Sequence, residues 1–521
     1  MHGLMGRAVC TRRNDVRLWR VTRGVLVKIA LSFSALGISV ELDLAICEQA
    51  RLTRDPRFDG RFFIGITSTG IYCRPICPSP HAKRTHVCFF PTAAAAAAAG
   101  FRPCLRCRPE VAPGTPAWRG TSDTVNHALR LISEGMLDDD DVDTLAMHVG
   151  VSARHLSRLF MQHLGTRPIA VAQTRRLHFA KQLITDTGLP MNQVALIAGF
   201  QSVRRFNDMI HQVYRRSPTE LRRFTEADRA GSGAEEYRFE LAYRPPYDWE
   251  SLMTFLGARA PPAVEAVRDG CYYRSIRLNS MSGTVEVGRI KGRHALYVRI
   301  RFPDPAQLLT IISRIRTMFD LTADPEMVSQ HLSRDPLLAP LVRDHPGLRV
   351  PGAWDGFEMT VRAILGQQIR VETATRLAGR LTMAFGHPLG EMAAYGLTHT
   401  FPEPATLAQV EIAGLPGTRK HAIQSLARAV ADGRIVFNAA LTGGDLPQCF
   451  KSINGIGEWT IQYVAMRVLN DPNAFPAPDR VLRRVAGQDR LFTKGWLLRR
   501  AEPWKPWRAY AAMYLWRGSS S

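Results

Sequence analysis

The chain has 521 residues, which is long enough for several domains, each with its own core. Its 68 Lys and Arg residues exceed its 46 Asp and Glu residues and give a formal net charge of +22, which favours a polyanionic partner, most simply nucleic acid. Nine cysteines in a chain of this length exclude a secreted disulfide framework and favour a reducing cytosol.

Residues 1–42 are expected to be an extension before the first domain. They contain a mostly apolar run at 24–40, which is short for a membrane helix and is interrupted by Lys28 and by serines. No clear small-residue cleavage site follows the run. We therefore expect no membrane association and a cytoplasmic location, with the true start of the chain further along, for example at Val40.

Four cysteines form two close pairs in the next segment: Cys73 and Cys77, then Cys104 and Cys107. Two such pairs on separate turns can surround one zinc ion tetrahedrally. A cluster of thiolates is negatively charged, so arginines around it are electrostatically favoured. Because arginines are present, an anionic polymer is a plausible neighbour of the cluster. The arginines concerned are Arg74, Arg102, Arg106 and Arg108. Spacing alone leaves open a structural zinc knuckle, a reactive zinc thiolate and thiols without metal.

The residues around these cysteines, STGIYCRPICP (68–78) and AAGFRPCLRCRP (98–109), resemble the N-terminal domain of Ada, the bacterial alkylation-response family. The resemblance implies that Cys73 is the nucleophile that takes a methyl group from a DNA methylphosphotriester. It also implies that Cys73, Cys77, Cys104 and Cys107 bind one zinc ion, which is both structural and thiolate-activating. Thr69 and Arg102 match residues of that family that contact DNA.

Two further DNA-contacting arginines of the family correspond to Pro78 and Pro80 in this chain. Lys83 and Arg84 follow closely and are candidates for the missing phosphate contact.

Two segments are predicted to be flexible linkers: residues 111–123, rich in Pro, Gly, Ser and Thr, and the small residues at 229–234. Before the first linker, the alanine run 93–99 follows Pro-Thr and precedes Gly100, which predicts a short helix. The predicted domains are 43–112, 120–226, 237–350 and 351–518.

Residues 120–226 are predicted to be helical and contain an internal repeat. Ala146-x3-Gly150 recurs as Ala195-x3-Gly199, and glycine fits the tight corner of a helix-turn-helix. Each copy is followed by an amphipathic basic segment, whose apolar residues should face the core and whose cations should face a DNA major groove. These cations are Arg154, Arg158, Arg204 and Arg205. The pattern alone leaves open a helical bundle with solvated arginines.

The two-copy layout and the ending YRRSPTELR (214–222) resemble the AraC-type DNA-binding domain across most of 122–224. That resemblance implies an all-α double helix-turn-helix domain that binds promoter DNA, with RNA polymerase as a partner. The acids at 138–141 precede a predicted helix and are interpreted as capping and dipole-favourable charge rather than as a metal site.

The C-terminal part is predicted to begin with a sheet and to continue with helices. Residues 272–278 and 295–300 alternate or carry β-branched side chains, which predicts strands. From Trp354 onward, the spacing of Phe357 and Val361 is helical.

The segment SINGIGEWT (452–460) has the pattern of a helix-hairpin-helix. Gly455 and Gly457 at a helix N-terminus let backbone N–H groups approach a phosphate. Alone this signal is weak, because many short turns of this kind bind nothing. Asp479 follows it, as an aspartate does in base-excision DNA glycosylases.

Further stretches resemble AlkA, the 3-methyladenine DNA glycosylase family, across about 240–517: YRPPYDW (243–249), PGAWDGFEMTVRAILGQQI (351–369), AGRL (378–381) and WKPWRAYAAMYLW (504–516). The resemblance implies that Asp479 is the catalytic carboxylate and that Trp459, Tyr463 and Trp516 line the pocket for the extruded base. Gln368 corresponds to the residue that fills the space left by that base. Helix capping by Asp479 and ordinary core packing of the aromatic residues are the alternatives.

Three features that the sequence lacks, and two positions where it differs from the AlkA family, make the expected activity more specific. Trp459 stands where strand-cutting glycosylases have lysine, so simple hydrolysis is expected. No cysteine follows Cys449, so no iron–sulfur cluster is expected. The Pro-Cys-His-Arg sequence of alkylguanine methyltransferases is absent, so repair of O6-methylguanine is not expected. Pro478 replaces a second acid of the family, and Gln368 replaces an apolar side chain.

We thus expect a multidomain α+β chain: a small zinc-binding α/β module, an all-α AraC-type double helix-turn-helix domain, and an AlkA-like β-containing subdomain with a helix-hairpin-helix glycosylase domain. Its expected function is the response to DNA alkylation, on damaged and promoter double-stranded DNA in the bacterial nucleoid, as a monomer. Two alternatives are a transcription factor with an inactive glycosylase-like module and a glycosylase with a purely structural zinc module.

Overall fold

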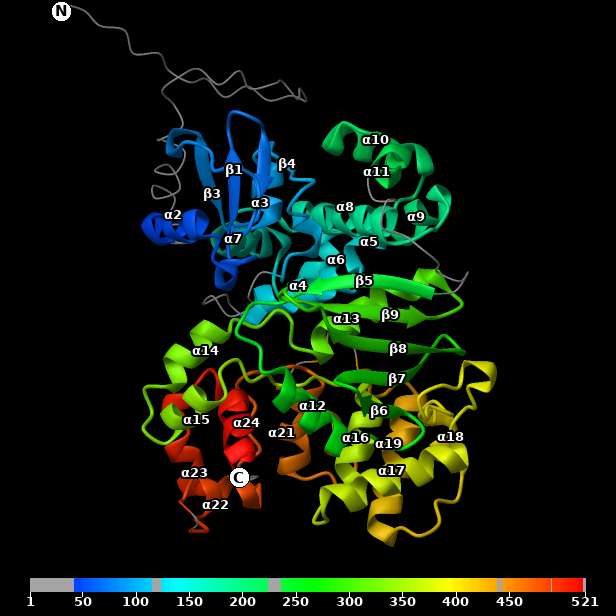
Figure 1. Cartoon of the computed structure of the whole chain (residues 1–521). Coiled ribbons are helices and arrows are strands. Elements are labelled where there is room, and N and C mark those ends of the chain that lie inside the picture. The colour runs from blue at the N-terminus through cyan, green and yellow to red at the C-terminus, as the bar shows by residue number, and fades with distance from the viewer. Residues whose placement is uncertain are drawn as a thin grey trace, which may run out of the picture.

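The computed structural model describes residues 42–114, 123–223, 236–437, 441, 444–488 and 490–518. Apart from residue 42, the expected extension lies outside these residues, as do the centre of the first predicted linker and the whole of the second. In the described part of the chain, no helix is long and apolar enough to cross a membrane. We call residues 42–114 the N-terminal module, 123–223 the helical module and 236–518 the C-terminal module (Figure 1).

The N-terminal module is built on a four-stranded sheet in the order β3-β1-β2-β4, in which only the β2–β4 pair is parallel. The alanine run forms α3 as predicted, and Thr92 Oγ1 caps it by accepting from Ala95 N at 2.9 Å. Its elements are α2 (Leu44–Thr53), η2 (Pro56–Phe58), β1 (Phe63–Ile66), β2 (Ile71–Cys73), η3 (Arg84–His86), β3 (Val87–Phe90), α3 (Ala93–Ala98), β4 (Arg102–Pro103) and η4 (Pro109–Val111).

The helical module confirms the predicted repeat. Gly150 and Gly199 have φ values of 73° and 81°, a left-handed conformation that favours glycine, at the two helix-turn-helix corners. Asp141 caps the helix after the acidic run by accepting from Thr144 N at 2.8 Å, as the capping interpretation predicts. The elements are α4 (Asp123–Ser133), α5 (Met136–Asp139), α6 (Val142–His148), α7 (Ala153–Leu164), α8 (Pro168–Asp186), α9 (Met191–Ile197), α10 (Val203–Tyr214) and α11 (Pro218–Arg223).

The C-terminal module opens with a five-stranded antiparallel sheet in the order β5-β9-β8-β7-β6. The strands predicted at 272–278 and 295–300 are confirmed as β7 and β9. This part contains β5 (Glu236–Ala242), α12 (Trp249–Ala258), β6 (Glu265–Arg268), β7 (Cys271–Leu278), β8 (Met281–Arg289), β9 (Ala295–Arg301), η6 (Pro305–Gln307) and α13 (Leu308–Met318).

The rest of the C-terminal module is helical, and the pattern after Trp354 is confirmed as α16. Helices α14 and α15 precede that pattern yet bury Val328, Leu332 and Leu338 in the same core as α16, so this core begins well before residue 350. The elements are α14 (Pro325–Leu332), α15 (Leu338–Asp344), α16 (Gly356–Leu365), α17 (Val371–Phe385), η7 (Gly390–Met392), α18 (Pro404–Gln409), α19 (Gly417–Ala431), α20 (Leu446–Cys449), α21 (Glu458–Arg467), α22 (Arg480–Val485), α23 (Lys494–Arg500), η8 (Glu502–Trp504) and α24 (Arg508–Gly518).

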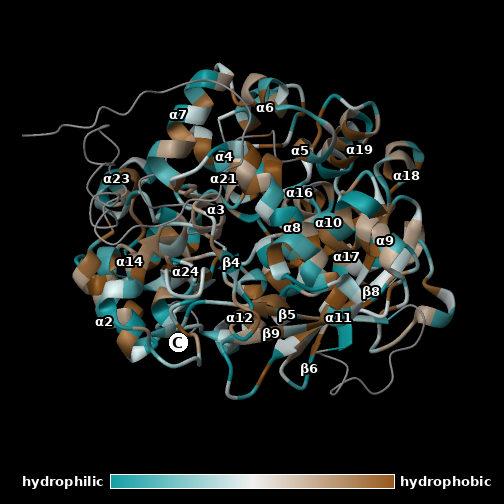
Figure 2. Ribbon diagram, turned by 90° about the horizontal axis from the view of Figure 1, so that it is seen from above, coloured by the Kyte–Doolittle hydropathy of each residue, from teal (hydrophilic) through white to brown (hydrophobic). Residues whose placement is uncertain are grey.

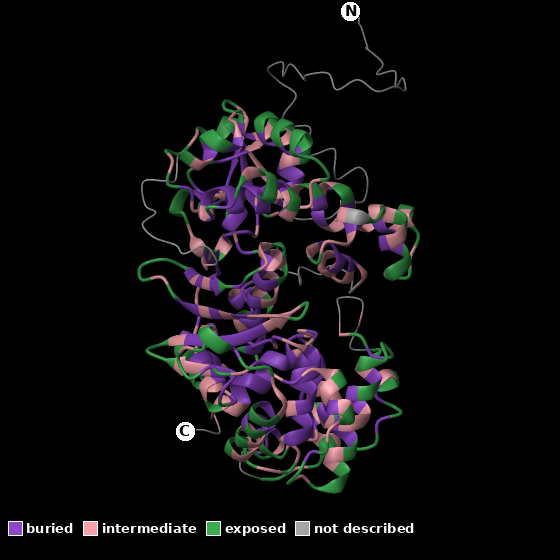
Figure 3. Ribbon diagram, turned by 90° about the vertical axis from the view of Figure 1, so that its right-hand side faces the viewer, coloured by how far each residue is buried: buried purple, intermediate pink, exposed green. Residues whose placement is uncertain are grey.

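The three modules pack against one another, although the sequence predicts flexible joints between them. One hydrophobic cluster includes Phe206 of the helical module together with Phe239 and Leu308 of the C-terminal module. Figure 3 shows buried residues throughout the interior of both the upper and the lower part of the molecule.

The N-terminal module is also attached directly to the C-terminal module. Arg61 forms an ion pair with Asp324, whose side chain is 1% exposed. The fully buried Arg244 donates from Nη1 to Thr322 O at 2.7 Å and from Nη2 to the carbonyls of Pro113 and Gly114. The end of the N-terminal module is therefore held by a side chain of the C-terminal module.

Candidate functional sites

The four predicted cysteine ligands come together at one edge of the small sheet. Cys73 ends β2, and Cys104 follows β4, its N–H donating to Tyr72 O at 3.0 Å. The four Sγ atoms all lie within 4.8 Å of one another, and Cys77 and Cys104 are separated by 3.9 Å. A tetrahedral zinc site with Zn–S bonds of about 2.3 Å has sulfurs about 3.8 Å apart. The cluster therefore fits zinc in both ligand type and spacing.

Arg74 supports this cluster from the inside of the module. It is buried, and its Nε donates to Asp59 Oδ1 at 2.8 Å, while its Nη1 donates to Cys107 O at 3.0 Å. The backbone N–H of Arg74 points at Cys107 Sγ, at 3.3 Å. Since N–H donors stabilise a thiolate, this loop favours the charged form of the sulfur. Arg74, which the sequence places among the arginines near the cysteines, is thus a structural part of the site.

The predicted DNA contacts of this module lie together beside the cluster. Thr69 is exposed in the turn before β2, and Arg102 on β4 places Nη2 3.5 Å from Thr69 O. Pro78 and Pro80 are exposed as well. The candidate replacements Lys83 and Arg84 are both exposed, and Arg84 lies over the Phe89 ring at 5.3 Å and 3.6 Å from Glu48. The structure brings Thr69 and Arg102 to one face, and their contact with DNA remains a prediction.

Residues next to two of the cysteines bind the long helix α8. The hydroxyl of Tyr72, directly before Cys73, lies 2.7 Å from His178 Nε2. Arg108, directly after Cys107, donates to Asp186 Oδ1 at 2.7 Å. Burial lowers the pKa of His178 to about 4, which keeps the ring neutral. The cysteine cluster is therefore fastened to the helix that joins the two helix-turn-helix units.

A buried ion pair completes this connection. Lys181 Nζ donates to Glu110 Oε1 at 2.9 Å, and the two side chains are 5% and 1% exposed. Burial raises the pKa of Glu110, but Lys181 and Arg108 outweigh it and hold the pKa at about 2. Neither residue was singled out from the sequence, because a buried charge pair leaves no local pattern.

The predicted DNA-reading arginines lie on the second helix of each repeat. Arg154 and Arg158 are exposed on α7, and Arg204 and Arg205 are exposed on α10, while Phe160 and Phe206 on the same helices are buried. In Figure 2 both helices carry hydrophilic as well as hydrophobic residues. This arrangement matches the expected division between core and groove faces.

The predicted hairpin lies between α20 and α21. Gly455 is exposed with a φ of 98°, which an L side chain rarely adopts, and a Cβ there would lie 3.1 Å from Ala422 Cβ. Gly457 is the N-cap of α21, and no side chain caps this helix in the described chain. The first amides of α21 are thus available to an anion, which the helix dipole also favours.

Asp479 caps a helix and also contacts two of the predicted pocket residues, while its catalytic role stays a prediction. Its Oδ1 caps α22 by accepting from Val481 N at 2.9 Å and Leu482 N at 3.0 Å. Its Oδ2 accepts from Trp459 Nε1 at 3.0 Å, and Trp516 Nε1 lies 3.4 Å from Oδ1. The carboxylate is half-buried, fixed by the helix it caps and turned toward two indoles.

The three predicted pocket aromatics lie together, with Trp459 and Trp516 in contact with this carboxylate and Tyr463 in contact with both indole rings. The rings of Trp459 and Tyr463 stack at 4.9 Å with an interplanar angle of 10°, and Tyr463 meets Trp516 edge-on at 6.3 Å. Arg467 Nη1 donates to the Tyr463 hydroxyl at 2.7 Å. Burial raises the pKa of Tyr463, but Arg467 and Arg259 outweigh it and lower the pKa below its ordinary value. Their role in recognising a base remains a prediction.

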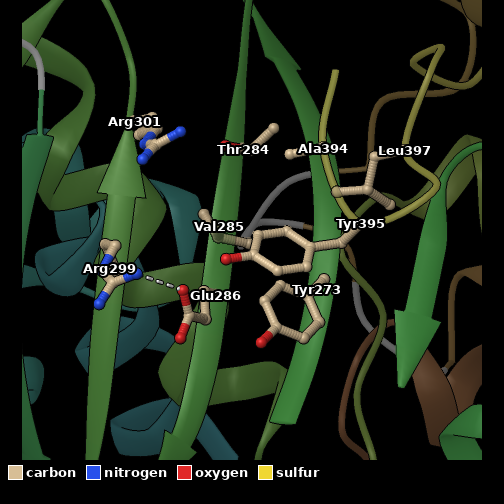
Figure 4. A pocket seen from close by; sticks show the side chains of 9 residues that line it. All are labelled: Tyr273, Thr284, Val285, Glu286, Arg299, Arg301, Ala394, Tyr395 and Leu397. Atoms are coloured by element: carbon tan, nitrogen blue, oxygen red, sulfur yellow. Dashed lines mark hydrogen bonds and ion pairs between the residues drawn. The ribbon is translucent and has the colours of Figure 1, made fainter. Parts of the chain in front are cut away.

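A separate hollow lies on the outer face of the five-stranded sheet. The ring of Tyr395 stacks on Tyr273 at 4.2 Å, and Arg299 pairs with Glu286 at its floor (Figure 4). None of the predicted site residues lines this hollow.

Comparisons with known proteins agree with this arrangement. Three family models match: the metal binding domain of Ada over 46–110, a helix-turn-helix domain over 145–223 and the AlkA N-terminal domain over 238–355. A Mycobacterium tuberculosis protein named "Probable bifunctional transcriptional activator/DNA repair enzyme AlkA" is 39% identical over 485 residues, covering 91% of this chain and 96% of the relative.

Two relatives from Escherichia coli match separate parts of the chain. "DNA-3-methyladenine glycosylase 2" is 34% identical, over 53% of this chain and 96% of its own length. "Bifunctional transcriptional activator/DNA repair enzyme Ada" is 39% identical over 152 residues, covering 29% of this chain and 41% of that protein.

Proposed function

Since this chain belongs to the family of bifunctional transcriptional activators and DNA repair enzymes that includes the Mycobacterium tuberculosis protein, we propose that it senses and repairs alkylated DNA. The observation that carries the proposal is the presence of two candidate reaction centres on one chain. One is the cluster of four thiols, and the other is the carboxylate of Asp479 between two indoles.

The first activity is methyl transfer from a DNA methylphosphotriester to Cys73. Zinc bound to the four sulfurs would keep the thiol of Cys73 deprotonated and nucleophilic at neutral pH. The Cys73 sulfur attacks the methyl carbon, an S–C bond forms, and the C–O bond breaks. The phosphate oxygen keeps the electron pair, which leaves an ordinary phosphodiester and a methylated protein. Arg102 beside the cluster would bind a neighbouring phosphate.

Methyl transfer should also change the affinity of the chain for promoter DNA. It converts one thiolate to a neutral thioether and removes a negative charge that repels phosphate. A single charge in a partly screened site corresponds to a coupling of roughly 1–3 kcal/mol. The partly buried contacts of Tyr72 and Arg108 with α8 support communication with the DNA-reading helices.

The second activity is hydrolysis of the N-glycosidic bond of an alkylated base such as 3-methyladenine. Phosphate binding at the hairpin and extrusion of the base would bring it among Trp459, Tyr463 and Trp516. A base alkylated at N3 or N7 is cationic, so it leaves readily and is attracted to aromatic faces. The Asp479 carboxylate would stabilise the positive charge that develops on the sugar and orient water.

The finer features are proposed on the same basis. We expect one zinc ion and no iron–sulfur cluster. We also expect base removal without strand cleavage, because Trp459 stands where strand-cutting enzymes have a lysine and offers no amine to form a Schiff base. The expected partners are damaged and promoter DNA and RNA polymerase, with the protein acting as a monomer on the bacterial chromosome.

Both activities can be measured in one sample. The protein is incubated with methylated duplex DNA, its intact mass is recorded, and released bases are identified. We expect a mass gain of one methyl group on Cys73 together with released 3-methyladenine. Base release without any mass gain would reduce the thiol cluster to a structural role. A mass gain without base release would leave the C-terminal module as a DNA-binding domain only.

A further inference from the structure

The loop between α16 and α17 carries two consecutive glutamines in different surroundings. Gln368, predicted to fill the space of the extruded base, is exposed and has a φ of 56°. This left-handed conformation is unfavourable for a residue with a Cβ, so neighbouring contacts must hold it. Gln367 is partly buried and turns back into the protein.

Gln367 connects this loop to the hairpin. Its Nε2 donates to Gly455 O at 2.7 Å and to Thr460 Oγ1 at 3.1 Å. Its own backbone carbonyl accepts from the Arg419 guanidinium on α19. One side chain therefore bridges the hairpin turn and the first turn of α21, while its backbone is held from a third element.

The chemistry of these contacts calls for an amide nitrogen at this point. Gly455 O can only accept, so an oxygen facing it would be repelled. A flipped amide or a carboxylate would place an oxygen there, whereas the NH₂ group supplies two hydrogens to two oxygens. The orientation of Gln367 is therefore set by its partners.

We propose that Gln367 is a positioning residue that keeps Gln368 and the Gly455–Gly457 hairpin at one fixed separation. This inference rests on the glycosylase function proposed above. The hairpin holds the backbone of the damaged strand, and Gln368 occupies the stack when the base leaves. Extrusion succeeds only if both act on the same nucleotide step, so a loose connection should slow extrusion without removing phosphate binding.

The test compares Gln367→Met with Gln424→Met. Gln424 is also half-buried and donates from Nε2 to a backbone carbonyl, Val410 O, at 2.9 Å, and Val410 is not a predicted site residue. Single-turnover release of 3-methyladenine is measured on two duplexes, one with the lesion paired and one with it mispaired. A mispaired base needs less work to extrude.

We expect Gln367→Met to slow release from the paired duplex about tenfold, the scale of losing a pair of hydrogen bonds. The mispaired duplex should show a much smaller loss, and Gln367→Glu should be slower than Gln367→Met on the paired one. Gln424→Met should behave like the wild type on both.

Three outcomes would overturn the proposal. One is wild-type release by Gln367→Met from the paired duplex, and another is an equal loss on both duplexes, which indicates a merely structural role. The third is an equal loss in Gln424→Met. Failure of the wild-type protein to release the base from either duplex would instead contradict the proposed glycosylase function, and this inference with it.

Discussion

The thiol cluster and the glycosylase site are built in opposite ways. All four cysteines lie in one stretch between Cys73 and Cys107, on two turns of a small sheet. The glycosylase site draws Gln368, Asp479 and Trp516 from separate helices and loops of a large core. The first centre can be completed by a metal, whereas the second depends on packing over a long stretch of chain.

The difference predicts how each centre fails. A locally encoded metal site should respond to the loss of a single ligand or of the metal, with little effect elsewhere. A site assembled by packing should respond to charges and hydrogen bonds that fix its parts.

The largest expected effect is at the nucleophile. Cys73→Ala should abolish the gain of one methyl group on incubation with methylated DNA, because no other sulfur holds the same position. Cys88→Ala is the matched control, since Cys88 is a half-buried cysteine of the same sheet and lies outside the cluster. The intact mass of each variant tests whether the methyl group is gained, and peptide mapping of the wild-type protein locates it. A methyl group on Cys77 would show that the nucleophile is misassigned.

The next effect concerns the contact between the cluster and α8. Lys181→Met leaves the buried Glu110 without one of its cations, and losing one partner of a buried pair costs about 3–5 kcal/mol. Denaturant unfolding should show this loss in the N-terminal and helical modules. Lys505→Met removes a partner from the exposed pair with Glu502, so its effect should stay within about 0.5 kcal/mol. Equal stability of the two variants would show that the modules are not held together by this pair.

At the glycosylase site, Asp479→Asn should reduce single-turnover release of 3-methyladenine about 10²–10³-fold, the scale for one preorganised electrostatic group. Asparagine caps a helix nearly as well as aspartate, but its NH₂ would face Trp459 Nε1–H in place of an oxygen, so a modest fall in melting temperature should accompany the loss of activity. Asp141→Asn alters another N-cap, that of α6, and should leave release unchanged. Release at the wild-type rate by Asp479→Asn would leave capping as the only role of this residue.

The smallest effect is on how stability depends on pH, which should differ between the C-terminal module and the thiol cluster. Burial, opposed by Arg349 and Tyr510, raises the pKa of Asp320 from 3.8 to about 6. The folded chain therefore binds this proton more tightly than the unfolded chain, and the resulting stability is complete below pH 3.8 and lost as the pH rises through about 6. Thiolate ligands show the opposite trend, because acid protonates them and weakens metal binding.

Asp320→Asn removes this dependence. Above pH 6 it should raise the free energy of unfolding of the C-terminal module by at most about 3 kcal/mol, and the gain should vanish toward pH 4. Unfolding curves at both pH values test this, and a gain that persists in acid would exclude ionisation of Asp320 as its cause.

The sequence predicts the thiol cluster more completely than the glycosylase site, because the residues of the cluster are close in sequence and those of the glycosylase site are not. The cysteine pairs, the glycine corners of the repeats and the strands β7 and β9 follow from local spacing. The resemblance to known families places Asp479, but no local pattern reveals that Trp459 donates a hydrogen bond to it. The bridge made by Gln367 and the pair between Glu110 and Lys181 join segments that are distant in sequence, so only the folded chain shows them.

Arg244 has a consequence for how the protein could be taken apart. Its guanidinium holds the carbonyls at 113 and 114, and Arg61 adds a buried pair to Asp324 nearby. The peptide connection between residues 114 and 123 is thus not what keeps the N-terminal module in place. A protease cut there should leave two pieces that elute as one complex. The chain could accordingly be produced as two separate polypeptides that reassemble on mixing.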